Sequence, residues 1–154
     1  MSYTTARTKL VELIEGTTPA TIGLQGLPRT FVHDDRASDL LAPSPRRFYL
    51  AFSSGAGAGS EAAGFYTVGR RTRLKTVDVV IGYQRITNAA LLDAAMGDDL
   101  DAISDSLLAS ENWDPTNSGI VAISQGGNTA LPHSVEQLEN DVILCRLQFG
   151  LEHY

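Results

Sequence analysis

The sequence predicts an α+β domain in which an antiparallel or mixed sheet of about four strands is packed by two helices on one face. Two observations predict it: six segments show the apolar periodicity of a helix or a strand, and they follow one another in the order α-β-β-α-β-β. In this order both helices can bury an apolar face against the same side of an antiparallel sheet. With 154 residues, 43% of them hydrophobic, the chain has the usual length of one domain, so we expect a single domain over residues 1–154.

The two predicted helices cover residues 4–15 and 88–110. The apolar positions of the first are Ala6, Leu10, Leu13 and Ile14. Those of the second are Leu92, Met96, Leu100, Ile103 and Leu107. Gly16 is a typical terminator of the first helix, and Asn88 is a typical N-cap of the second. Because a glycine inside a helix costs about 1 kcal/mol relative to alanine, Gly97 is a candidate bend or interruption.

Four segments alternate apolar and polar residues as half-buried strands do, and they cover residues 47–53, 73–83, 120–124 and 141–151. We expect the first two to pair as a hairpin. Its tip, residues 53–72, is rich in Gly, Ala and Ser and is therefore expected to be long and flexible. The preceding connection, residues 17–45, is broken by proline and glycine, and runs such as residues 30–32 have the length of a brief strand.

No pattern in the sequence indicates catalysis or metal binding. The glycine-rich residues 55–60 lack both the lysine of a phosphate-binding loop and the spacing of a dinucleotide-binding loop. His33, His133 and His153 lie far apart along the chain, and none has a cysteine or second histidine at metal-site spacing. Cys145, the single cysteine, falls on the predicted core face of the last strand. We therefore expect no enzyme activity, no metal and no cofactor, and no apolar run approaches the ~18 residues of a membrane span.

Charge is divided unevenly along the chain. The net charge is −6, but the balance is +4 through Thr87 and −10 from Asn88 onward. Such an asymmetry suits a protein whose basic side meets the acidic side of an identical neighbour. The alternative interpretation is that both sets of charges are solvated surface.

Two sets of residues are therefore candidate sites. The basic set, a candidate partner-binding or channel-facing loop, is Arg70, Arg71, Arg73 and Lys75. The acidic set, a candidate inter-subunit face, is Asp98, Asp99, Asp101 and Asp105. The acidic set has helical periodicity instead of the ligand spacing of a calcium loop. The basic set has neither interleaved aromatic residues nor a recognition helix, which argues against nucleic-acid binding as the main role.

Five segments in sequence order carry a resemblance to a known family: TTARTKLVELIEG, RRFYLAFSSG, TRLKTVDVVIGYQ, ALLDAAMGDDLDAISDSLL and NDVILCRLQFGLEHY. The third segment leads at once into the fourth, and the last is a long apolar alternation. In this order, and over most of the chain, they resemble the tail terminator (tail completion) proteins of long-tailed bacteriophages. Residues 17–45 match no part of that pattern.

The resemblance implies a structural virion protein of the tail or neck, assembled in the host cytoplasm. It implies a homo-hexameric ring that caps the tail tube, ends tail elongation and provides the surface for head-tail joining. Its partners would be further copies of the chain, the tail tube protein and the head-tail connector or stopper protein. DNA would pass through the ring without sequence-specific binding.

Three alternatives stay open. Another phage neck or minor tail protein, such as a stopper, would share the same features. From a different class, a small ligand-binding or enzymatic α+β domain can assemble its site from scattered loop residues that form no motif. A nucleic-acid binder would be marked by a steep loss of affinity with salt.

Overall fold

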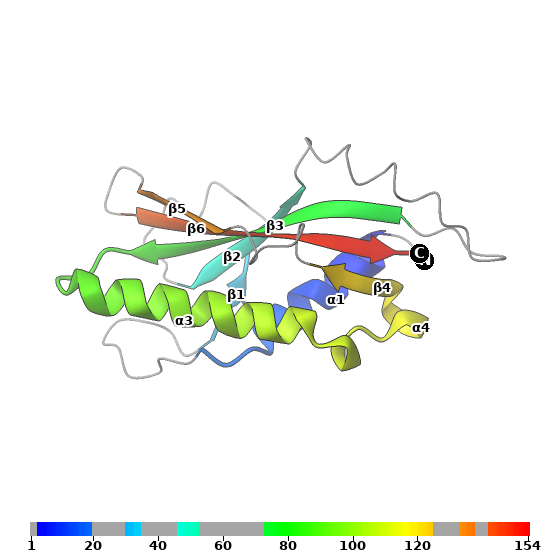
Figure 1. Cartoon of the computed structure of the whole chain (residues 1–154). Helices are drawn as coiled ribbons and strands as arrows, with labels where there is room; N and C mark the ends of the chain where they lie inside the picture. Colours follow the sequence, from blue (N-terminus) through cyan, green and yellow to red (C-terminus); the bar gives the residue numbers. More distant parts are fainter. Residues whose placement is uncertain (1–2, 20–29, 35–45, 53–72, 125–132, 138–141) are drawn as a thin grey trace.

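The computed structural model describes residues 3–19, 30–34, 46–52, 73–124, 133–137 and 142–154, and these residues form an α+β fold. The expected fold class is thus confirmed (Figure 1). The elements in chain order are α1 Tyr3–Glu15, β1 Val32–His33, β2 Arg47–Phe52, β3 Arg73–Gln84, α3 Ala89–Leu108, the 3-10 turn η3 Ser110–Asn112, α4 Pro115–Ser118, β4 Ile120–Ser124, β5 His133–Gln137 and β6 Val142–His153.

The described strands form one mixed sheet with the path β1-β2-β3-β6-β4. Its centre is the antiparallel pair β3 and β6, which runs from Arg73 opposite His153 to Gln84 opposite Val142. The other edge of β6 is shared, because β5 pairs with its first half and β4 with its last residues. β2 pairs antiparallel with β3, as the hairpin prediction requires, and β1 adds a short parallel pair to β2.

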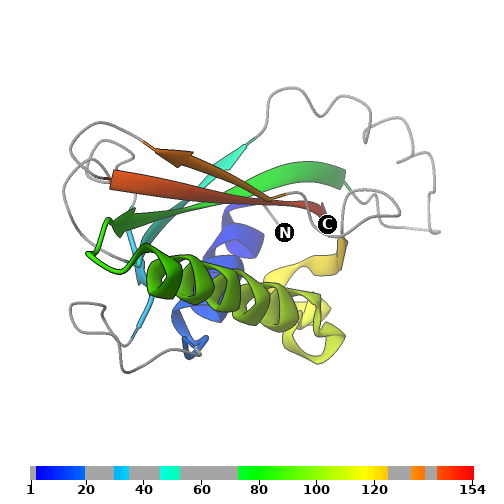
Figure 2. The same ribbon diagram turned by 60° about the vertical axis from the view of Figure 1, so that its left-hand side comes forward.

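The long helices α1 and α3 lie on the same face of the sheet, and the main core fills the space between them and β3 and β6 (Figures 1 and 2). Alternation along a strand sends every second side chain to this face. Each fully buried aliphatic or Phe side chain contributes about 1.5–3 kcal/mol to folding. The side chains that β3 and β6 contribute to this core are Val77, Val79, Ile81, Tyr83, Ile143, Cys145, Leu147, Phe149 and Leu151.

Helix α3 begins at the expected cap. The side-chain oxygen of Asn88 accepts a hydrogen bond from the Leu91 N–H at 3.2 Å. Gly97 does not interrupt the helix, which continues to Leu108. A Cβ atom added at Gly97 would meet nothing within 4 Å, so the glycine lies on the open side of the helix.

The strand number and order differ from the sequence expectation of four strands. Strand β1 falls at the end of the run at residues 30–32, and β5 was not expected at all. Each pairs with a longer strand but contains a single apolar residue, Val32 or Val135, so neither shows the apolar alternation by which a strand is predicted. A third, four-residue helix, α4, starts with Pro115, a favoured first helical residue. The proposed flexible tip, residues 53–72, lies outside the described residues.

Candidate interaction surface

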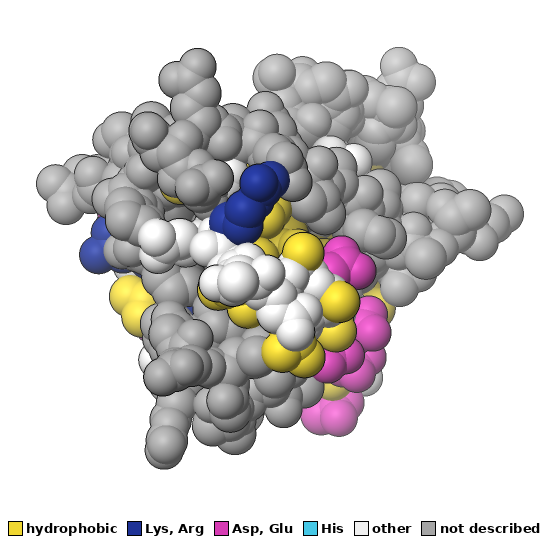
Figure 3. All heavy atoms as spheres, turned by 90° about the vertical axis from the view of Figure 1, so that its left-hand side faces the viewer, with side chains coloured by type: hydrophobic (Ala, Val, Ile, Leu, Met, Phe, Trp, Pro, Cys, Tyr) yellow, Lys and Arg dark blue, Asp and Glu magenta, His cyan; other side chains and the backbone are white. Residues whose placement is uncertain are grey.

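The charged residues on the exposed side of α3 are all acidic. The helix contains five aspartates and neither Lys nor Arg. Small exposed residues accompany them: Ala90 precedes the first aspartate, and Ala94 and Gly97 follow it. Figure 3 looks at the end of the molecule where α3 begins and shows acidic side chains gathered along one flank of an apolar area. We call this surface the α3 acidic face, and its charged members are Asp93, Asp98, Asp101 and Asp105.

The structure corrects the assignment of Asp99 to this face. Its side chain is completely buried and accepts two hydrogen bonds from Arg46, at 2.8 Å from Nε and 2.9 Å from Nη2. Asp99 follows Met96 by three residues and precedes Ile103 by four, and both of these are buried. Helical periodicity therefore places Asp99 on the core side of α3, where a neighbouring copy cannot reach it.

A third group completes this buried cluster. The Tyr83 hydroxyl donates to Asp99 Oδ2 at 2.6 Å, and burial, together with the Asp99 charge, raises the pKa of Tyr83 well above its usual value. The Arg46 backbone has a φ of 60°, and its N–H donates to the Gly82 carbonyl at 2.9 Å. The cluster thus fixes the start of β2 and the end of β3 to α3. With Asp99 on the core side of α3, the exposed aspartates of the helix face away from the sheet.

Sequence reasoning missed this cluster, although a signal for it was present. An aspartate at position 99 interrupts the apolar stripe of a helix, and a buried carboxylate needs a cationic or hydrogen-bonding partner. The sequence alone did not single out Arg46 as that partner, because it adjoins Arg47. Arg47 instead lies 3.2 Å from Asp34 and is part-exposed.

Two residues of the basic set, Arg73 and Lys75, are among the residues that the structure describes. Arg70 and Arg71 lie outside the described residues. Arg73 is exposed at the start of β3, and the Lys75 ammonium lies 5.2 Å from the ring centroid of Tyr3, over its face. These two residues belong to the sheet layer, whereas the α3 acidic face points away from the sheet. Arg73 and Lys75 therefore lie in a different layer from the α3 acidic face.

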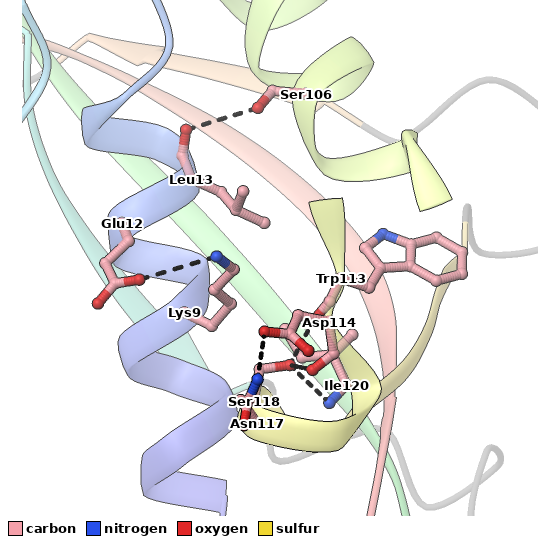
Figure 4. A network of polar contacts seen from close by, with 9 residues as sticks. All are labelled: Lys9, Glu12, Leu13, Ser106, Trp113, Asp114, Asn117, Ser118 and Ile120. Carbon is pink, nitrogen blue, oxygen red and sulfur yellow. Dashed lines mark hydrogen bonds and ion pairs between the residues drawn. The ribbon is translucent and has the colours of Figure 1, made fainter. Parts of the chain in front are cut away.

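A hollow of about 430 Å³ lies between α1 and α4, beside the polar contacts that Figure 4 draws. The Ser118 hydroxyl lies within hydrogen-bond reach of the Trp113 and Asp114 carbonyls and accepts from the Ile120 N–H at 3.1 Å. The Asn117 amide donates to the Asp114 carboxylate at 2.9 Å. These bonds are internal to the turn, which makes it a rigid support for β4. The hollow is lined by Thr4, Thr5, Thr8, Lys9, Glu12, Asp114, Asn117 and Ser118.

Cys145 has the surroundings of a core thiol, as its place on the strand predicted. Its Sγ lies 3.5 Å from Met96 Sδ, and burial raises the pKa of the thiol to about 12, with the Asp99 charge adding to the effect. The thiol is therefore neutral near pH 7 and a poor nucleophile. Among the described residues, no three His, Cys, Asp or Glu side chains gather as metal ligands would.

The features that the described chain brings together are thus an acidic helix face and a buried ion pair on the core side of the same helix. Within the same residues, no helix is both long enough and apolar enough to cross a membrane. The chain was also compared with known proteins. No protein-family model and no curated protein matches it.

Proposed function

We propose that this chain is the repeating subunit of a ring that caps the tail tube of a long-tailed bacteriophage. The α3 acidic face is the observation that carries the proposal. It offers four exposed aspartates with small exposed residues beside them, and helix α3 itself contains neither Lys nor Arg. The order of the sequence segments that resemble tail terminators supports the same conclusion.

A closed ring needs two different patches on each copy, because each subunit meets its two neighbours through opposite sides. The acidic face supplies one patch. The basic residues Arg70, Arg71 and Arg73 supply the other in this proposal. Exposed ion pairs contribute only about 0.2–1 kcal/mol each, so the charges set orientation and register more than affinity.

In this role the ring ends tail elongation and presents a surface to the head-tail connector or stopper protein. DNA passes through it without sequence-specific contacts, and the protein resides in the tail or neck of the virion. The role requires no cofactor and no catalytic step. A different neck protein would have the same needs, and only its binding partner would separate it from a terminator.

The experiment is the mass of the purified protein in solution, measured by light scattering after size exclusion, alone and after mixing with tail tubes. A ring of about six copies, or a monomer that becomes a ring on tubes, is expected from the resemblance and from closed symmetry. A monomer that ignores tubes would contradict the proposal and favour the ligand-binding alternative.

A matched pair of variants tests whether the acidic face carries assembly. Asp101→Lys reverses an exposed charge on α3, whereas Glu111→Lys reverses an exposed charge in η3, off that helix. We expect the first to weaken ring formation and the second to leave it unchanged. Equal effects would show that total charge, and not this face, controls assembly.

A further inference from the structure

The start of α3 borders a hollow of about 650 Å³, which is within the ~300–1,000 Å³ typical of ligand-binding clefts. It is formed by three parts of the chain: the connection that follows β3, the first turns of α3 and the first residues of β6. The side chains of Leu92, Met96 and Ile143 line it, and all three residues are almost fully buried. The hollow therefore has an apolar floor.

The apolar surface continues outside the hollow. Ala90 is exposed and lines the hollow, and Leu91, the next residue along α3, keeps 48% of its surface exposed. Figure 3 shows this apolar area at the end of the molecule. A small molecule usually has 70–90% of its surface buried within a cleft. Apolar surface that extends beyond the cleft is more typical of a protein-docking site.

The charges around the hollow indicate what the partner carries. Arg85 and Asp93 line it, and both are exposed. Beyond Asp93 the surface continues as the α3 acidic face, with Asp98 and Asp101 exposed on the same helix. A partner that covers Leu91 and runs along α3 therefore meets mainly negative charge, and basic residues complement it.

We propose that this hollow binds one large apolar side chain of a partner-protein segment in which lysine or arginine residues flank that side chain. The apolar side chain fills the space above Leu92, Met96 and Ile143. The flanking cations face Asp93 and the acidic residues that follow it. Central apolar anchors of this kind carry most of the binding energy of an interface, whereas charges at its rim mainly steer association.

The inference rests on the proposed function only in taking the partner to be a protein, and the two are tested separately. Ring assembly is measured without peptide, and peptide binding is measured whether or not a ring forms. The probe is a short synthetic peptide with one central phenylalanine flanked by lysines. A second peptide has alanine at the centre, and a third has glutamates in place of the lysines.

Binding is followed by NMR from the amide signals of Ala89, Ala90 and Ile143 in the full chain. Replacing the central phenylalanine with alanine is expected to weaken binding by about tenfold or more, since it removes the buried apolar area. The glutamate peptide is expected to bind more weakly than the lysine peptide. The affected signals should cluster around the hollow.

The chain offers a control away from this surface, because Thr116 is exposed on α4 and does not line the hollow, whereas the exposed Ala90 does. Ala90→Trp should fill the hollow entrance and weaken the phenylalanine peptide about tenfold, while Thr116→Trp changes its affinity less than about twofold. Three results would overturn the proposal: equal loss in both variants, equal binding of the phenylalanine and alanine peptides, or no binding at millimolar peptide.

Discussion

At the scale of single residues, the buried Arg46–Asp99 pair decides how α3 sits on the sheet. Both side chains are fully buried, so removing one partner leaves an uncompensated charge in the core. We expect Arg46→Met to lower the free energy of unfolding by about 3–5 kcal/mol in chemical denaturation. The exposed Asp101→Asn is the control, with a change within about 0.5 kcal/mol.

The pair is expected to specify the position of α3 more than to stabilise the fold. The triple variant Arg46→Met/Tyr83→Phe/Asp99→Leu removes both charges of this cluster and the Tyr83 hydroxyl that donates to Asp99. This triple variant should regain most of the free energy that Arg46→Met loses, because apolar residues of similar volume often replace a buried ion pair without cost. A triple variant no more stable than Arg46→Met would contradict this.

His153 is a buried histidine whose pKa is shifted from its usual value. Its Nδ1 donates to the Tyr154 oxygen at 2.7 Å, and its Nε2 is the buried side-chain atom without a hydrogen-bond partner among the described residues. Burial lowers the pKa of His153 below 6.5, although the Tyr154 contact opposes this shift. The positive charges of Lys75, Arg73 and the N-terminus lower it further.

The unfolded chain therefore binds the His153 proton at higher pH than the native protein does. The contribution of the neutral imidazole is fully present above pH 6.5 and is lost as the pH falls below that value toward the native pKa. Urea denaturation between about pH 5 and 8 measures it. The His153→Phe variant should lose this part of the pH dependence. A wild-type stability that rises on acidification through this range would argue against a depressed pKa.

At the scale of elements, the long helices and strands could be predicted from the sequence, whereas the shortest strands could not. The 12-residue strands β3 and β6 and the 20-residue helix α3 each repeat their apolar pattern several times, and all three were predicted. Strands β1 and β5 contain only two and five residues, and each has a single apolar residue, Val32 or Val135, so neither shows an apolar alternation. Asp99 could not be separated from its exposed neighbours by composition, because only the helical phase of position 99 distinguishes it.

A substitution at Gly97 tests whether the exposed surface of α3 has room for an added side chain. It lies inside the helix, and an added Cβ atom has open space around it. We expect Gly97→Ala to raise the free energy of unfolding of the isolated chain by about 0.5–1 kcal/mol, since alanine has the higher helix propensity. Gly150→Ala is the control at a crowded position, because its added Cβ atom would lie 2.9 Å from Ser124 Oγ. Thermal and chemical denaturation of both variants would measure the difference, and a destabilised Gly97→Ala would contradict it.

At the scale of the whole molecule, the proposed ring depends on unlike charges meeting across every interface. Assembly should then weaken as salt rises, since the Debye length falls from about 10 Å at 0.1 M to 3 Å at 1 M. A mixing experiment tests the pairing more sharply than salt does. One variant, Asp98→Lys/Asp101→Lys/Asp105→Lys, has a basic patch on both sides, and another, Arg70→Glu/Arg71→Glu/Arg73→Glu, has an acidic patch on both sides.

Each variant alone is expected to remain monomeric in light scattering, because every contact in a ring of identical copies would then join like charges. An equimolar mixture should form rings again, since in a ring with an even number of copies the two variants can alternate and restore unlike charges at every interface. A mixture that stays monomeric while the wild type forms rings would show that the basic set does not face the α3 acidic face. Rings formed by either variant alone would show that charge does not select the interface.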